Sequence, residues 1–219
     1  MKLTLIRHGQ SSNNALPEYQ RIEDPGLTAL GEEQAESLRS WADQAQLTTL
    51  LVSPFRRTLL TARPIHEATN LACQVWIDLH ERGGCYSGYQ PSNFQGRPGM
   101  SGEQIQADFP ETILVDDIGK LGWWQSKPRE TDEEAHGRAQ RIAERLSDTY
   151  AHTEEHVACV MHADFKLILT SHLLGRDVDS SFPPIYHNAS VTTLVRDSSG
   201  GFVAEIENST EHLPSSIRP

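Results

Sequence analysis

Short apolar segments alternate with amphipathic segments along this chain, and this alternation restricts the fold more than any other feature of the sequence. β-Branched and other apolar residues gather in the expected strands, at residues 2–7, 50–53, 74–78 and 156–161. Apolar residues recur at helical spacing in the expected helices, at residues 28–43, 132–150 and 165–174. Strands that alternate with helices are typical of βαβ units, so we expect an α/β fold with a mostly parallel central sheet. Residues 191–195 and 202–206 are expected to form a hairpin around the polar turn 197–201, which adds an antiparallel edge strand.

One long segment, residues 82–130, breaks this alternation. It is rich in Gly and Pro and contains Trp123 and Trp124. Its length exceeds that of an ordinary connection within a compact domain. We expect a lid or cap insertion within a single domain of residues 1–219, the alternative being a rigid insertion packed away from the site.

The composition of the chain limits the classes of molecule that we expect it to bind. The formal net charge is −11, whereas nucleic acids and anionic membranes are held chiefly by clustered Lys and Arg, so we expect neither as a partner. The scattered cysteines Cys73, Cys85 and Cys159 lack the spacing of a disulfide framework or a zinc site, which predicts reduced thiols. No apolar segment approaches the roughly 18 residues that span a bilayer, and the chain begins directly in a strand. We therefore expect a cytoplasmic protein.

Charged and titratable residues follow the expected strands at the points where these strands end. Arg7, His8 and Gly9 close the first strand, and Ser53 and Pro54 close the second as the expected start of a helix. That helix would carry Arg57 in its first turn, and Glu81 and His162 follow the third and fourth strands. The carboxyl ends of parallel strands lie on one edge of a sheet, so these side chains are expected to converge there. Taken singly, each has an ordinary alternative: a solvated arginine, a loop carboxylate or a core histidine.

Longer motifs surround these residues and give the strongest signal in the sequence. They are Arg7-His8-Gly9-Gln10-Ser11 with Asn14, Leu27-Thr28-x-x-Gly31 with Gln34-Ala35, Ser53-Pro54-x-x-Arg57 with Thr61-Ala62, Leu79-x-Glu81, His162, and Asn188-Ala189-Ser190-Val191-Thr192. In these motifs the chain resembles the histidine phosphatase superfamily, in the branch of the phosphoglycerate mutases and fructose-2,6-bisphosphatase. The resemblance implies a three-layer α/β/α fold and phosphomonoester hydrolysis through a phosphohistidine.

The resemblance also implies roles for the converging residues. His8 resembles the nucleophile, which attacks as a neutral imidazole while its other nitrogen is held as N–H by a backbone carbonyl. Arg7 and Arg57 resemble the arginines that hold the phosphoryl oxygens, and His162 resembles a further donor to them. Glu81 resembles the proton donor to the leaving alkoxide.

Several neighbouring residues are expected to contact the phosphate or the rest of the substrate. Asn14 would donate to the phosphoryl group, Gly9 would let the backbone approach it, and Ala163 would line its pocket. Arg82 and Tyr86, which follow Glu81, are expected to meet the variable part of the substrate.

The competing candidate for the acid is Asp164, because another branch of the superfamily places an Asp directly after its second His. Here Ala163 intervenes between His162 and Asp164. We therefore favour Glu81.

Two other functions compete with net hydrolysis. Mutases of the family carry an arginine-rich insertion after the acid, and residues 82–130 contain no Arg-Arg pair. A phosphate-binding module without turnover is the other alternative. We expect a hydrolase that acts on a small phosphorylated substrate and needs neither a metal nor another cofactor, because arginines supply the positive charge and no set of metal ligands is evident.

Overall fold

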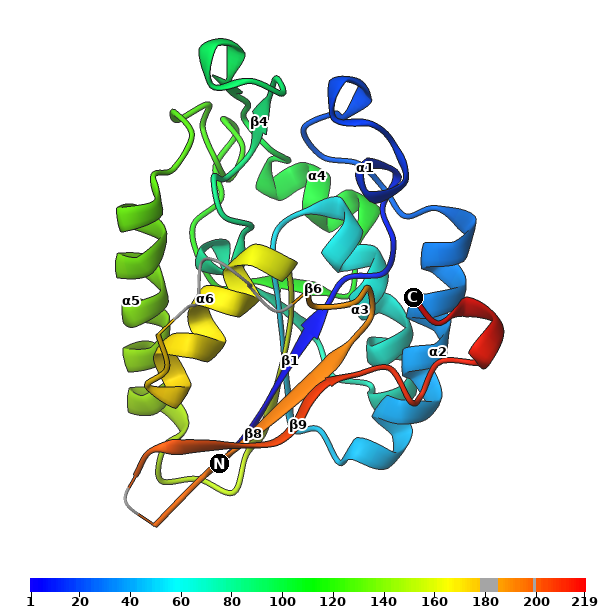
Figure 1. The fold of residues 1–219 in the computed structure, drawn as a ribbon, viewed down its shortest axis with the longest axis vertical. Coiled ribbons are helices and arrows are strands. Elements are labelled where there is room, and N and C mark those ends of the chain that lie inside the picture. The colour runs from blue at the N-terminus through cyan, green and yellow to red at the C-terminus, as the bar shows by residue number, and fades with distance from the viewer. Residues whose placement is uncertain (178–184, 199) are drawn as a thin grey trace.

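The computed structural model describes residues 1–177, 185–198 and 200–219. Among these residues, a seven-stranded sheet has the order β6-β3-β2-β7-β1-β8-β9 (Figure 1). Its strands are β1 (Lys2–Arg7), β2 (Thr49–Val52), β3 (Cys73–Val75), β6 (Thr112–Leu114), β7 (His156–Met161), β8 (Val191–Arg196) and β9 (Phe202–Ser209). Strands β6, β3, β2, β7 and β1 run parallel, whereas β8 is antiparallel to both β1 and β9. The expected α/β class, the mostly parallel sheet and the C-terminal hairpin are confirmed; Ser199, in the expected turn, lies outside the described residues.

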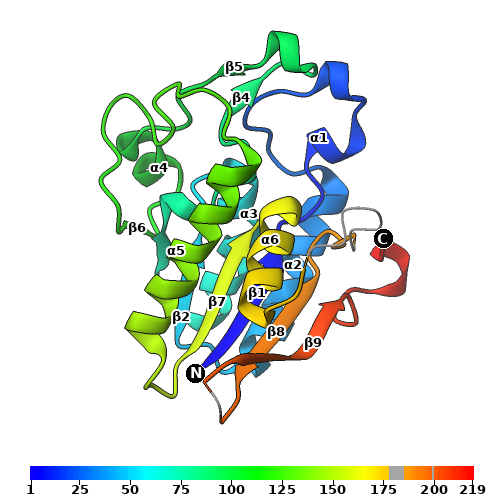
Figure 2. The ribbon, with the colours of Figure 1, turned by 60° about the vertical axis from the view of Figure 1, so that its left-hand side comes forward.

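Helices cover both faces of the sheet (Figure 2). The longer helices are α2 (Ala29–Ala45), α3 (Arg56–Thr69), α5 (Asp132–Tyr150) and α6 (Ala163–Leu174). Successive strand residues point to opposite faces, so Ile6 packs in the core beneath α2 and α3, and Leu5 packs in the core beneath α5 and α6. The result is the three-layer α/β/α arrangement that the resemblance implied.

Side-chain oxygens cap the N-termini of α2 and α5, whereas the expected side-chain cap of α3 does not form. The Oγ1 atoms of Thr28 and Thr131 accept from backbone N–H groups in the first turns of α2 and α5. The expected cap at Ser53 is wrong, because α3 begins at Arg56 with Phe55 at its N-cap position. Ser53 instead contacts His162, so its hydroxyl belongs to the site.

The third strand is shorter than expected. It ends at Val75, and a 3₁₀ helix, η2 (Ile77–Leu79), carries the chain on towards Glu81. In the sheet, Val75 pairs with Val52 of β2 on one side and with Leu114 of β6 on the other. The expected strand at 74–78 is therefore corrected at its C-terminal end.

Residues 82–130 are more ordered than the sequence indicates. They contain β4 (Tyr86–Ser87), η3 (Pro91–Asn93), β5 (Gln95–Gly96), α4 (Gly102–Asp108) and the edge strand β6. Trp123 and Trp124 are 2% and 8% exposed and pack in the core near Phe55 and His80. The second half of this segment is thus part of the main body, and the β4–β5 hairpin is the part that stands above the sheet edge (Figures 1 and 2).

The first loop of the chain faces that hairpin. It contains the short helices α1 (Ser12–Ala15) and η1 (Glu18–Gln20), and it lies at the same end of the molecule as β4 (Figure 1). The C-terminal turn η4 (Ser215–Ile217) contacts α2. Within the described ranges, no helix is both long and apolar enough to cross a bilayer.

Candidate active site

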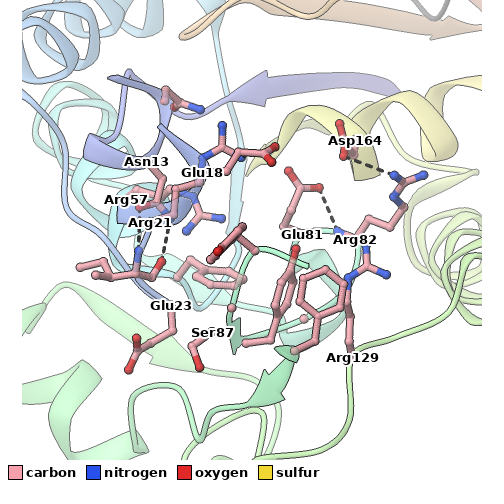
Figure 3. Close-up of a pocket in the computed structure, with 18 of the residues that line it drawn as sticks. Asn13, Glu18, Arg21, Glu23, Arg57, Glu81, Arg82, Ser87, Arg129 and Asp164 are labelled. Atoms are coloured by element: carbon pink, nitrogen blue, oxygen red, sulfur yellow. Dashed lines mark hydrogen bonds and ion pairs between the residues drawn. The ribbon is translucent and has the colours of Figure 1, made fainter. Parts of the chain in front are cut away.

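The residues that follow β1, β2 and β7 meet at one edge of the sheet, as the sequence predicts. They lie at a cavity of about 350 Å³ between this edge, the first loop and the β4–β5 hairpin (Figure 3). The predicted residues that line it are Arg7, Asn14, Arg57, Glu81, Arg82, Tyr86 and Ala163. His8 and His162 lie directly beneath this lining and are almost completely buried.

His8 is held in one tautomer. Its Nδ1 lies 2.6 Å from the Gly9 carbonyl oxygen, which can only accept, so Nδ1 carries the proton. The Nε–H of Arg57 donates to His8 Nε2 over 3.2 Å, so Nε2 presents its lone pair. Burial, followed by the charges of Arg57 and Arg7, holds the pKa of His8 well below its usual value. The imidazole is therefore neutral, with a nucleophilic nitrogen directed at the cationic side of the site.

His162 lies beside His8. The two imidazole centroids are 5.2 Å apart, and Ser53 Oγ lies 2.8 Å from His162 Nε2. Burial and the charge of Arg57 hold the pKa of His162 well below its usual value. Its Nδ1 is buried and has no hydrogen-bond partner among the described residues. An unmet buried polar atom costs about 1–3 kcal/mol, so Nδ1 is a candidate contact for a bound group.

Glu81 is a carboxyl group suited to hold a proton. Its Oε1 accepts from the backbone N–H groups of Arg82 and Phe165, at 2.9 and 3.0 Å. Burial raises the pKa of Glu81, and the nearby carboxylate of Asp164 raises it further, whereas Arg57 opposes the shift. The two N–H groups occupy Oε1, so Oε2 remains for a transferable proton.

Asp164, the competing acid, is in a different environment. Its side chain is 61% exposed and pairs with Arg82 over 3.8 Å. By contrast, the Glu81 carboxyl group is held by two backbone N–H groups. Between the two candidates, the geometry therefore supports Glu81 as the acid.

Arg7 and Arg57 supply positive charge without a carboxylate partner. Arg7 Nη1 donates to the Tyr186 carbonyl oxygen, and its buried Nε has no partner in the described part of the chain. The guanidinium of Arg57 lies 4.1 Å above the Phe55 ring. Neither arginine forms an ion pair with any described carboxylate within 4.0 Å. Such uncompensated cations in a partly enclosed cavity attract an anion.

Asn14 lies at the rim of the cavity with its amide orientation set by its neighbours. Its Oδ1 accepts from Ser11 Oγ at 3.0 Å and from Asn188 Nδ2 at 3.2 Å. The amide NH₂ of Asn14 is therefore left as a donor. Ala163, the first residue of α6, lines the cavity beside it.

Gly9 is also required by packing. It does not line the cavity; a Cβ at this position would lie 2.4 Å from the carbonyl oxygen of Gly31. Its N–H donates to Thr61 Oγ1 at 3.1 Å. Close packing of the end of β1 against the start of α2 therefore leaves no room for a side chain here, and approach of the backbone to a phosphate stays a prediction.

Arg82 and Tyr86 form the wall of the cavity nearest to Glu81. The Arg82 guanidinium pairs loosely with Asp132 and Asp164, at 3.7 and 3.8 Å. The Tyr86 ring meets Phe94 edge to face at a centroid distance of 4.9 Å. Both residues line the cavity, as expected.

Several contributors were missed in the sequence. Tyr186 acts through its backbone carbonyl, which has no sequence signature. Lys166 is fully buried, donates to the Ser190 carbonyl oxygen at 3.2 Å and lies over the Tyr186 ring at 4.4 Å. The same Ser190 oxygen accepts from Arg7 N–H. A lone lysine inside the apolar run of α6 was the available signal for this support of Arg7.

Metal-ligating side chains do not cluster in the part of the chain that the structure describes. There, no group of three or more His, Cys, Asp or Glu side chains is placed to hold a metal ion. The three cysteines are buried and unbridged, and burial raises the pKa of each thiol to about 12.

Known proteins resemble this chain locally in sequence and throughout in fold. It is 41% identical over 71 residues to phosphoserine phosphatase 1 of Hydrogenobacter thermophilus, a match that spans 32% of this chain and 34% of that enzyme. It is 35% identical over 78 residues to a probable phosphoglycerate mutase, GpmB, of an Enterobacter species, a match that spans 36% of this chain and 35% of that protein. The matched stretches thus span about a third of the curated relatives' length.

A solved structure with a similar fold is a mycobacterial glucosyl-3-phosphoglycerate phosphatase. The TM-score is 0.66 at 22% identity, and the match covers 95% of this chain and 99% of the other. At this identity the likeness concerns the fold. The sequence profile of branch 1 of the histidine phosphatase superfamily matches residues 3–209, nearly the whole chain. With its paired histidines and arginines at the carboxyl edge of the sheet, this chain belongs to the histidine phosphatase superfamily.

Proposed function

We propose that this protein is a phosphomonoester hydrolase that acts on a small phosphorylated metabolite through a phosphohistidine at His8. The observation that carries the proposal is the state of His8: a buried, neutral imidazole whose Nε2 lone pair faces Arg57. A nucleophile of this kind beside uncompensated arginines suits attack on a phosphoryl group.

The first step transfers the phosphoryl group to the protein. His8 Nε2 forms a bond to phosphorus as the bond to the ester oxygen breaks, and Glu81 gives its proton to that departing oxygen. Arg57 Nε–H leaves the Nε2 lone pair and turns to the phosphoryl oxygens, which Arg7 also holds. An alkoxide is a poor leaving group, so the proton from Glu81 is essential for alkyl esters.

The second step returns the site to its starting state. Glu81, now a carboxylate, takes a proton from a water that attacks phosphorus, and the N–P bond breaks with its electron pair returning to Nε2. Inorganic phosphate leaves, and Glu81 is again protonated. His162 Nδ1 and the Asn14 amide supply neutral donors to the phosphoryl oxygens during both steps.

Mutase activity is the second candidate, and it is favoured by the partial match to a probable phosphoglycerate mutase. A mutase must keep its bisphosphorylated intermediate under a closed, cationic cover. In the described part of the covering region, Arg97 pairs with Glu23 and Arg82 with two aspartates, so Arg129 is the one lining arginine left without an acidic partner. A single unpaired arginine is less than the arginine-rich cover of a mutase. Hydrolysis therefore fits better. Measuring phosphate release against transfer to a phosphoglycerate acceptor separates the two activities.

The proposed reaction should need no metal ion. After exhaustive chelation, the wild-type protein should release phosphate from an aryl phosphate at its original rate, because Arg7 and Arg57 supply the charge that a metal would otherwise bring. The measurement is phosphate release before and after dialysis against EDTA. Loss of activity that added Mg²⁺ or Zn²⁺ restores would contradict metal independence, whereas absence of turnover with every ester in a broad panel would contradict hydrolysis itself.

Selectivity should depend on Arg82 and Tyr86. Alanine at either position should change kcat/KM by about tenfold for some phosphoesters and little for others, since contacts to the variable part of a substrate are typically worth that much. Formation of phosphohistidine from acetyl phosphate should remain nearly intact. Tyr19→Ala is the matched control, because Tyr19 is 66% exposed and does not line the cavity. An equal loss for all substrates and for acetyl phosphate would assign both residues to the chemistry or the fold.

A further inference from the structure

The cavity contains more positive charge than one phosphoryl group requires. Its described lining includes the arginines Arg7, Arg21, Arg57, Arg82 and Arg129 and the acids Glu18, Glu23, Glu81 and Asp164. Each acid has a partner. Glu18 pairs with Arg21 at 3.4 Å, Glu23 with Arg97 at 4.0 Å and Asp164 with Arg82 at 3.8 Å. Glu81 accepts from two backbone N–H groups and has a raised pKa.

Three lining arginines therefore lack an acidic partner among the described residues. Arg7 and Arg57 are explained by the phosphoryl group that they hold beside His8. Arg129 is not explained by it. Its Nε is buried and has no hydrogen-bond partner in the described ranges. In Figure 3, Arg129 lies on the other side of Glu81 from Arg57, next to Arg82.

The Arg129 side chain is held in place by packing. Its guanidinium carbon lies 5.3 Å from the centroid of the Tyr86 ring and 5.0 Å from that of Phe94. Its stem crosses Gly83, where a Cβ would lie 3.1 Å from Arg129 Nε and where φ is +96°. Aromatic rings engage the face of a guanidinium and leave the N–H groups at its edge free to donate. Arg129 is thus a positioned donor without an acceptor.

Arg82, unlike Arg129, has acidic partners among the described residues. Its charge is already shared between Asp132 and Asp164. Arg21 is likewise paired with Glu18 and is exposed. Of the arginines beyond the phosphoryl end, Arg129 alone in the described lining combines a fixed position with an unmet charge.

On the basis of the proposed function, we infer that Arg129 binds a second anionic group of the substrate. The substrate class is then phosphate monoesters whose leaving alcohol carries a carboxylate or a second phosphoryl group. The planar fork of an arginine matches either group with two parallel N–H donors. Phosphoryl binding by Arg7 and Arg57 and anion binding by Arg129 would orient such a substrate across Glu81, which then meets the ester oxygen between them.

The test uses paired substrates that differ in one charge. ω-Phosphooxy carboxylic acids of increasing chain length are compared with their primary amides, which keep size and polarity, and with the matching bisphosphates. At one chain length, wild-type kcat/KM for the acid or the bisphosphate should exceed that for the amide by about tenfold or more. Arg129→Gln should remove this preference and leave the amide within about twofold of its wild-type value.

Two further variants make the result specific. Arg129→Lys keeps the charge but loses the fork, so it should retain part of the preference. Arg39→Gln is the matched control and should retain all of it, because Arg39 pairs with Glu36 and Glu67 on the surface of α2 and does not line the cavity. If the wild-type protein shows no preference at any chain length, or if Arg129→Gln lowers acid and amide equally, the inference is wrong.

A binding measurement separates this inference from the proposed hydrolysis. Phosphonate analogues of the acid and amide, which cannot be cleaved, are titrated into wild-type protein and Arg129→Gln by calorimetry. Tighter binding of the acid that depends on Arg129 supports the second anion site even if no ester is turned over. Equal affinities for both analogues in both proteins overturn it, whatever the activity.

Discussion

His8→Ala should abolish turnover, with a loss of about 10³-fold or more, as expected when a covalent nucleophile is removed. The loss follows from the position of Nε2, which presents its lone pair beside Arg57. Wild-type protein is incubated with a phosphate donor and quenched in base, which preserves a phosphoramidate, and the modified peptide is located by mass spectrometry. The label should lie on His8.

The control for this experiment is a histidine on the surface. His152 lies exposed in the turn between α5 and β7, at the sheet edge opposite the carboxyl ends of the parallel strands, and His152→Ala should keep both the label and full turnover. Binding of inorganic phosphate should persist in His8→Ala, because both arginines remain, so a loss of turnover can be assigned to chemistry. A label on another residue, with His8→Ala still active, would overturn the mechanism.

Glu81→Gln should slow phosphate release from alkyl esters by about 10²- to 10⁴-fold, the range typical of general acid catalysis. Aryl esters should lose much less in the first step, because an aryl oxide leaves without a proton. The comparison is made by single-turnover measurement of phosphohistidine formation from matched alkyl and aryl phosphates. Equal losses for the two ester types would exclude Glu81 as the acid. A larger effect of Asp164→Asn would transfer that role to Asp164.

The same measurement has a defined pH dependence. The pKa of Glu81 is raised, so its acid form persists above the usual range of a carboxyl group, and the rate for alkyl esters should fall as pH rises through that raised pKa. The pKa of His8 is lowered, so protonation of the nucleophile should reduce the rate only in the acid range below its usual value. Glu81→Gln should remove the alkaline fall and keep the acid one.

One nearby carboxyl group needs its own control. Burial raises the pKa of Asp24 to about 6, and the charge of Arg57 lies close enough to oppose this shift. Asp24→Asn should therefore leave the alkaline fall in place. If it abolished that fall, the ionisation would belong to Asp24 and not to Glu81.

Much of the site could be predicted because its residues adjoin the ends of strands. Arg7 and His8 follow an apolar run, and His162 follows another, so local patterning alone places them. Once β1, β2 and β7 are parallel, their carboxyl ends share one edge whatever the loops do. The convergence of these residues with Arg57 is thus a consequence of chain direction.

Other parts of the fold could not be predicted, because their local sequence does not indicate the structure that they adopt. Strand β6 lies in a Gly- and Pro-rich segment and is three residues long, so it gains its stability from pairing with β3 rather than from its own propensity. Trp123 and Trp124 are buried by contacts with residues distant in sequence, such as Phe55. The spacing of apolar residues along the chain gives no information on contacts between residues that are distant in sequence.

The α/β class, the order of the main strands and helices, and the places of Arg7, His8 and His162 at strand ends could be predicted from the sequence, because these follow from short-range hydrophobic pattern and chain direction. The folded structure was needed to show which ring nitrogen of His8 carries the proton, how Gly9 packs on Gly31 and that Arg129 lacks an acidic partner among the described residues. Each of these depends on atoms brought together from distant segments or on backbone carbonyls. Hydrogen bonding, burial and charge act through space, so their outcome is set only when the chain has folded.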